Sequence, residues 1–168
     1  LALVLAQRTI EDGSIYPSLP SSIFYPRVPL VRFLSGADGE PYRIVGLEYA
    51  LLPNFSAVYR LDDVRGYEAM TFARLYQTYP LWCTPGQATF NQVSDLRRPF
   101  LSMLNVRYAV TSKDVQPPPG WRIAVVDRST QVLENSRALP RAFVPSVVAY
   151  ANRDGIPVAM HVQDDFAG

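Results

Sequence analysis

The chain has 168 residues, enough for one domain, and 48% of them are apolar, so it can build its own core. Its formal net charge of +1 excludes strong nonspecific attraction to nucleic acid, and we expect no nucleic-acid partner. The charged share of 18% is below the usual value of about 25%. The low share of charged residues indicates a domain that packs against a partner or against a membrane-bound part of the same protein.

The first residues, Leu1 to Ala6, are all apolar, and the run stops at Gln7. A membrane span needs about 20 apolar residues, so this run is either an ordinary first helix or strand or the end of a truncated span. Residues 11–29 contain four prolines, which fix φ and remove backbone donors, and they predict an extended arm without a helix. We therefore expect residues 1–28 to be an N-terminal extended arm after a presumed membrane span. Residues 29–168 would form a single domain with a truncated C-terminus.

Three helices and one strand are predicted in the first part of this domain. A short helix starts at Pro29, because proline is favoured in a first helical turn, and a strand follows at 42–48. The longest helix is predicted at 67–79, where apolar residues recur at spacings of three to four and Pro80 ends the pattern. A second helix is predicted at 96–104.

The second part is rich in β-branched residues, and it predicts four strands at 106–112, 121–127, 130–135 and 141–149. A strand, a helical crossover and a meander of this kind give a mixed sheet. The expected fold class is α+β, or mixed α/β. Its mixed β-sheet would carry helices on one face and follow the proline-rich arm.

Asp62, Asp63 and Arg65 form the densest polar cluster of the sequence. Two carboxylates beside an arginine can bind a cation or a sugar hydroxyl. Adjacent side chains diverge, however, and are a poor acid/base couple, because a glycosidase needs its two carboxyls about 5–9.5 Å apart across a substrate. The alternative is structural: one of the aspartates caps the helix at 67–79, and an Arg–Asp pair closes a turn at Gly66.

Motifs for catalysis and for metal binding are weak. The only histidine, His161, argues against a Ser-His-Asp triad, and with the carboxylates at 164–165 it is better explained as part of a solvated tail than as a metal site. None of the nine glycines forms a phosphate-binding loop, and the only cysteine, Cys83, has no basic neighbour in sequence and predicts a buried, inert thiol. We expect no catalytic residue, no metal and no cofactor. A carboxylate pair assembled from distant positions, such as Glu48 with Asp62, stays open.

Aromatic residues suggest two further interpretations. Their rings can line a binding site and stack on sugars, or they can belong to the core, which is the commoner role. The residues concerned are Tyr16, Phe24, Tyr25, Tyr76, Tyr79, Trp82 and Phe90.

Several stretches, taken together and in order, resemble one bacterial family. They are FYPRVPLVRFL with PYRIVG (24–46), LPNF with DDVRGYE (52–68), LNVRYAV (104–110), and LEN with ALPRAF (133–143). Each motif is short, and the ordered set carries the resemblance. The set is similar to the soluble extracytoplasmic region of the YfhO-like multi-spanning membrane proteins, over about residues 24 to 145.

The resemblance implies a parent similar to the membrane glycosyltransferases that use polyprenyl-phosphate sugars, with its catalytic acid upstream of Leu1. This fragment would then be a non-catalytic accessory domain on the extracytoplasmic face of the cell membrane, helping to hold an acceptor for cell-envelope glycan synthesis. Its partners would be the rest of the parent and a lipid-linked sugar or cell-envelope glycan. One alternative is a purely structural module that packs on the parent's membrane loops. A weaker alternative is a free-standing carbohydrate-active hydrolase.

The polar residues in or near the similar stretches are the candidates for contact with a glycan, an acceptor or the parent. They are Asn54, Asp62, Asp63, Arg65, Tyr67, Asn105 and Arg141.

Overall fold

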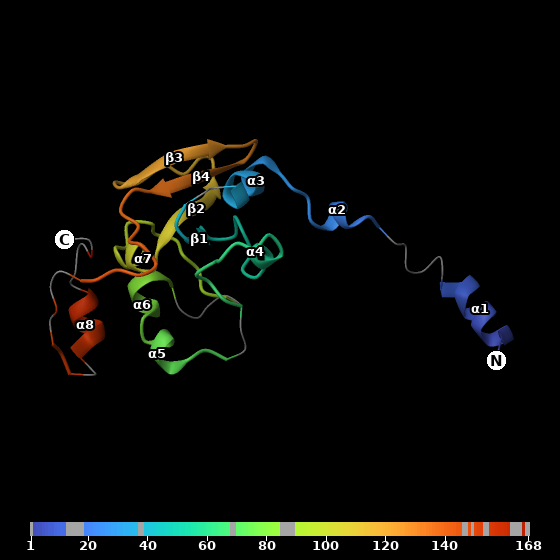
Figure 1. The fold of residues 1–168 in the computed structure, drawn as a ribbon, viewed down its shortest axis with the longest axis horizontal. Helices are drawn as coiled ribbons and strands as arrows, with labels where there is room; N and C mark the ends of the chain where they lie inside the picture. Colours follow the sequence, from blue (N-terminus) through green and yellow to red (C-terminus); the bar gives the residue numbers. More distant parts are fainter. Residues whose placement is uncertain are drawn as a thin grey trace.

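Four strands form one mixed sheet in the order β1-β2-β4-β3 (Figure 1). The strands of this computed structural model are β1 (Arg43–Gly46), β2 (Val106–Ser112), β3 (Trp121–Val126) and β4 (Thr130–Asn135). β1 pairs with β2 in parallel, whereas β2 with β4 and β3 with β4 are antiparallel. The predicted α+β class with a mixed sheet is confirmed. The structure describes residues 2–12, 19–36, 39–67, 70–84, 90–145, 148, 150–152, 155–161 and 166.

Helices cover both faces of the sheet, although one face was expected. Successive side chains of a strand point to opposite faces, so β1 and β4 each contribute to two cores. On the first face, Leu30 and Leu34 of α3 (Pro29–Gly36) cluster with residues of three strands: Ile44, Tyr108, Val110 and Val132. On the second face, α6 (Tyr79–Trp82) and α7 (Phe100–Met103) cluster with Val45, Ala109 and Leu133.

The helix predicted at 67–79 is wrong. The described part of this segment holds one single turn, α5 (Ala73–Tyr76), and after a turn at 77–78 only the first residue of α6; residues 68–69 lie outside the described residues. Pro80 has no N–H to donate to the carbonyl four residues earlier, and it sits instead in the first turn of α6. The helix predicted at 96–104 likewise shrinks to α7, which begins after Pro99.

The strand predicted at 141–149 is wrong over residues 141–145, which are exposed bends and coil. Pro140 and Pro145 bracket this stretch and remove donors that a ladder would need. Of the rest, 146, 147 and 149 lie outside the described residues. The described segment is exposed, and Arg141 contacts Asp62 at the site described below.

The N-terminal part contains two helices where an extended arm was predicted. α1 (Ala2–Asp12) is exposed over residues 2–11, and α2 (Ser21–Phe24) is a single turn that begins directly after Pro20. Figure 1 shows α1 at the far end of this segment and the sheet at the other. In the part of the chain that the structure describes, no helix has the length and hydrophobicity to cross a membrane. The remaining helices are α4 (Phe55–Val58) and α8 (Gly155–His161).

Candidate functional site

Asp63 and Arg65 form a buried ion pair. The Nη2 atom of Arg65 lies 2.9 Å from Oδ2 of Asp63, and the side chains are 0% and 2% exposed, respectively. Oδ1 of Asp63 also accepts hydrogen bonds from the backbone N–H of Arg65 at 2.9 Å and from its Nε at 3.1 Å. The aspartate therefore closes a tight turn and orients the guanidinium at the same time.

Further contacts complete the surroundings of the Arg65 guanidinium. Nη1 donates to the carbonyl of Glu48 at 3.2 Å, Nη2 donates to the carbonyl of Leu51, and Cζ lies 5.7 Å from the ring centroid of Phe90. A buried arginine needs such partners, because an unpaired charge in the interior is costly. The pair joins the turn at 63–65 to the loop after β1.

The prediction that Asp62 or Asp63 caps the helix at 67–79 is wrong, because the N-cap position of α5 is Phe72 and no side chain caps it.

Asp62, unlike Asp63, has an exposed side chain, and it forms an ion pair with Arg141. Nη1 of Arg141 donates to Oδ2 of Asp62 at 2.8 Å, and the two side chains are 40% and 55% exposed. Surface pairs of this kind contribute little to stability. Both residues line two neighbouring cavities, so the pair lies at the border between them.

Asn105 acts indirectly, by holding the segment that carries Arg141. Its Nδ2 donates to the carbonyl of Leu139 at 2.7 Å, and the N–H of Leu139 donates to the carbonyl of Ser102 at 3.1 Å. Asn105 is buried and has a φ of 61°, a left-handed conformation that asparagine tolerates better than most residues. Leu139 lies two residues before Arg141, so these hydrogen bonds give Asn105 a role in positioning Arg141.

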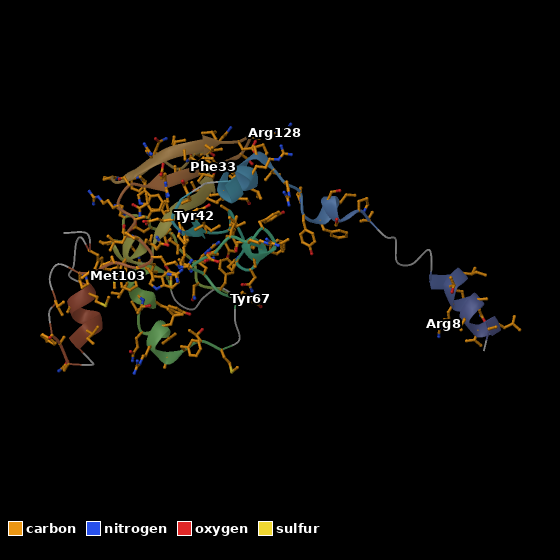
Figure 2. The ribbon with its side chains drawn as sticks, viewed as in Figure 1. Arg8, Phe33, Tyr42, Tyr67, Met103 and Arg128 are labelled. Carbon is orange, nitrogen blue, oxygen red and sulfur yellow. The ribbon has the colours of Figure 1, made fainter. Side chains whose placement is uncertain are left out.

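The smaller cavity has a volume of about 350 Å³ and contains five of the seven predicted residues. It is lined by Asn54, Asp62, Asp63, Arg65 and Arg141, together with other polar groups that sequence analysis did not select, among them Arg43, Ser56 and Asn91. Of the other two predicted residues, Asn105 does not line the cavity. Tyr67 is exposed at the periphery (Figure 2), and its carbonyl accepts a hydrogen bond from Nδ2 of Asn54 at 3.1 Å.

The larger cavity is an open groove of about 950 Å³ on the other side of the Asp62–Arg141 pair. Its walls come from the arm before α3, from α3 itself, and from the segments at 39–42 and 58–62. Tyr42 lies between α3 and the sheet (Figure 2), with its ring edge-on to Tyr108 at 5.1 Å. Burial raises the pKa of the Tyr42 hydroxyl, which donates to the carbonyl of Leu34.

Three of the four arginines of this groove were not predicted from the sequence. Arg27, Arg32 and Arg60 line it, together with Tyr25 and Tyr59. Two of the arginines fall within the first stretch that carries the family resemblance, at residues 24–34, but nothing in their local sequence shows that Arg60 joins them. Tyr25 thus lies at a cavity wall, and its stacking on a sugar stays a prediction.

The other aromatic candidates divide between core and surface. Tyr79 and Trp82 belong to the core, with ring centroids 5.5 Å apart, whereas Phe24 and Tyr76 are exposed. Phe90 is half-buried against Arg65, and Tyr16 lies outside the described residues.

The described residues give no support for a metal site or for a carboxylate pair of Glu48 with Asp62. Within the described ranges, no three residues among histidine, cysteine, aspartate and glutamate lie close enough to hold a metal ion. Glu48 lines neither of the cavities that Asp62 lines, so the two carboxylates do not share a site there. The carboxylates at 164–165 lie outside the described residues.

Cys83 is a buried thiol, as predicted, and we expect it to be inert. Burial raises its pKa to about 12, and nearby Arg98 lowers it only in part. Almost no thiolate forms at pH 8, so a thiol reagent such as Ellman's reagent should react with the native protein very slowly. One equivalent should react at once in denaturant. Rapid reaction of the native protein at pH 8 would contradict this assignment.

Comparison of this chain with protein-family models, with curated proteins and with solved structures finds no match. The similarity to the YfhO-like extracytoplasmic region therefore stays a prediction that rests on the ordered motifs. The functional proposal below rests on those motifs and on the two cavities.

Proposed function

We propose that this chain is a non-catalytic extracytoplasmic accessory domain of a bacterial membrane glycosyltransferase that acts on cell-envelope glycans. In this proposal the smaller cavity holds the saccharide acceptor. The observation that carries it is the Asp62–Arg141 ion pair, which joins residues 79 positions apart at the border of two cavities. A carboxylate accepts hydrogen bonds from sugar hydroxyls, and a guanidinium donates to them.

The surroundings of this pair support a binding role. Asp63 and Arg65 are buried and fully engaged with each other and with the backbone, so they give the cavity a fixed wall. Binding sites need such rigid support for the groups that contact the ligand. Asn54 and Asn91 add neutral donors and acceptors to the lining, which suits an uncharged, hydroxyl-rich ligand.

Titration calorimetry with a panel of neutral oligosaccharides tests the proposal. Asp62→Asn and Arg141→Gln should each weaken binding by about tenfold, because a hydrogen bond to a charged group is worth about 1.5–3 kcal/mol. Asp95→Asn and Arg97→Gln are matched controls, since Asp95 and Arg97 form an exposed ion pair at 2.9 Å that lines neither cavity.

Two results would contradict the acceptor-holding role. The first is that no neutral saccharide of the panel binds the folded wild-type domain. The second is that the control substitutions weaken binding as much as those at Asp62 and Arg141.

A second candidate function is a structural module that packs on its parent's membrane loops. Met70 and Phe72 favour it, because they are 86% and 83% exposed, and exposed Leu75 and Tyr76 follow them in α5. Clustered exposed apolar side chains commonly mark a protein contact. Met70→Ser with Phe72→Ser should then reduce association of the domain with the separately produced membrane part, and leave saccharide binding unchanged.

A further inference from the structure

We propose that the larger groove binds the carboxylate groups of an acidic saccharide, through Arg27, Arg32 and Arg60. The inference rests on the proposed function in one respect, because that function supplies the saccharide as the carrier of the charge. The anion site itself follows from the groove and is tested independently of the smaller cavity.

The three arginines come from three different segments and line one cavity. Arg27 lies in the arm before α3, Arg32 lies in α3, and Arg60 follows α4. A hydrogen bond from the Tyr59 hydroxyl to the carbonyl of Pro26, at 3.2 Å, ties the arm to the segment after α4. It joins the residues directly preceding Arg27 and Arg60, so the groove is held together at this point.

These guanidinium groups are free to bind a ligand. All three side chains are exposed, and none has an ion pair or a side-chain hydrogen bond with another residue that the structure describes. Five other arginines pair with carboxylates: Arg65, Arg97, Arg107, Arg122 and Arg141. An unpaired guanidinium presents a planar fork of donors that matches a carboxylate in two parallel hydrogen bonds.

The backbone at Arg60 is in an unusual conformation for a non-glycine residue. Its φ is 58°, in the left-handed region, and its N–H donates to the carbonyl of Ala57 at 3.0 Å. A left-handed residue other than glycine costs about 1 kcal/mol or more and persists where the surroundings enforce it, often next to a ligand site. This strain is consistent with a loop fixed to display Arg60.

The groove carries a net positive charge, and its arginines are distributed over separate segments. Its lining carries four arginines, Arg141 included, and two carboxylates, Glu40 and Asp62, which leaves a formal charge of +2. Guanidinium groups carried by separate segments suit singly charged groups spaced along a chain, whereas a phosphate monoester concentrates a charge of about −2 at one point. Glu40 can accept hydrogen bonds from sugar hydroxyls, and the ring of Tyr25 can pack against a sugar ring. Together these groups fit an oligosaccharide that contains uronic acids.

Calorimetry with three probes tests the inference: trigalacturonate, its trimethyl ester and a phosphorylated maltooligosaccharide. We expect trigalacturonate to bind at least about tenfold more tightly than the ester, which has the same sugars without the charge. Arg27→Gln, Arg32→Gln and Arg60→Gln should each weaken trigalacturonate binding by about three- to tenfold, and added salt should weaken it as well. Arg97→Gln changes the net charge equally, outside the groove, and should have no effect. Thermal melts should show that all four variants fold.

Several outcomes would overturn the anion site. They are a lack of trigalacturonate binding, equal binding of acid and ester, tighter binding of the phosphorylated probe, or an equal loss in Arg97→Gln. Equal binding of acid and ester would leave the proposed saccharide function intact. Conversely, trigalacturonate binding that depends on the three arginines but not on Asp62, with no binding of neutral saccharides, would overturn the acceptor cavity and keep the anion site.

Discussion

Replacing Asp63 with alanine is expected to lower the free energy of unfolding by about 3–5 kcal/mol. The substitution leaves the guanidinium of Arg65 buried at 0% exposure with backbone carbonyls and an aromatic ring as its remaining partners. The loss of an ion-pair partner in the interior is costly because water cannot replace it. Urea unfolding followed by circular dichroism measures the change.

Asp95→Ala is the matched control for this prediction. Asp95 forms the same two-residue arrangement with Arg97, in which its carboxylate accepts from the backbone N–H at 3.0 Å and from Nε at 2.9 Å. That pair is exposed, so its loss should cost a small fraction of the loss at Asp63. Equal effects of the two substitutions would show that burial of the Asp63–Arg65 pair does not determine its contribution.

Gly46→Ala is expected to destabilise the fold by about 3 kcal/mol, through overpacking. A Cβ atom at residue 46 would lie 2.5 Å from Nη2 of Arg65 and 2.8 Å from both the Cβ and the carbonyl oxygen of Leu51. The arginine cannot move aside without breaking the hydrogen bonds described above. Glycine is therefore required in β1 because Arg65 and the loop at Leu51 approach its backbone so closely.

Gly36→Ala provides the control within the same domain. Nothing lies within 4 Å of a Cβ atom at residue 36, which ends α3. Alanine there should be neutral or stabilise the protein by about 0.4–1 kcal/mol, because it restricts the unfolded chain. A wild-type midpoint for Gly46→Ala in urea would mean that the close approach of Arg65 to the strand is not required for stability.

The sheet was largely predictable from sequence, and the helices were not. Strands β2, β3 and β4 coincide with the predicted segments to within one residue, because β-branched runs alternate with clear turn residues. The predicted helix at 67–79 relied on the spacing of Met70, Ala73 and Leu75–Tyr76, and the structure exposes all four residues. Their periodicity therefore did not mark a buried face.

The candidate site was predictable only where its residues are neighbours in sequence. Asp62, Asp63 and Arg65 stood out as a cluster, but sequence alone could not show that Asp63 is buried while Asp62 is exposed. Arg27, Arg32 and Arg60 were not predicted, because they become neighbours only when the arm packs beside the segment after α4. No local pattern encodes that contact.

The parallel pairing of β1 with β2 has a consequence for the order of folding. β2, β3 and β4 follow one another closely in sequence, whereas β1 meets β2 only after the 59 residues from 47 to 105 have closed into a loop. Contacts between distant residues form slowly, since the entropy of loop closure must be lost first. The meander should therefore form early and β1 should dock late. Both cavities are lined by residues before, within and after that loop. A ligand that contacts all of these residues therefore stabilises the complete domain over its partly folded forms.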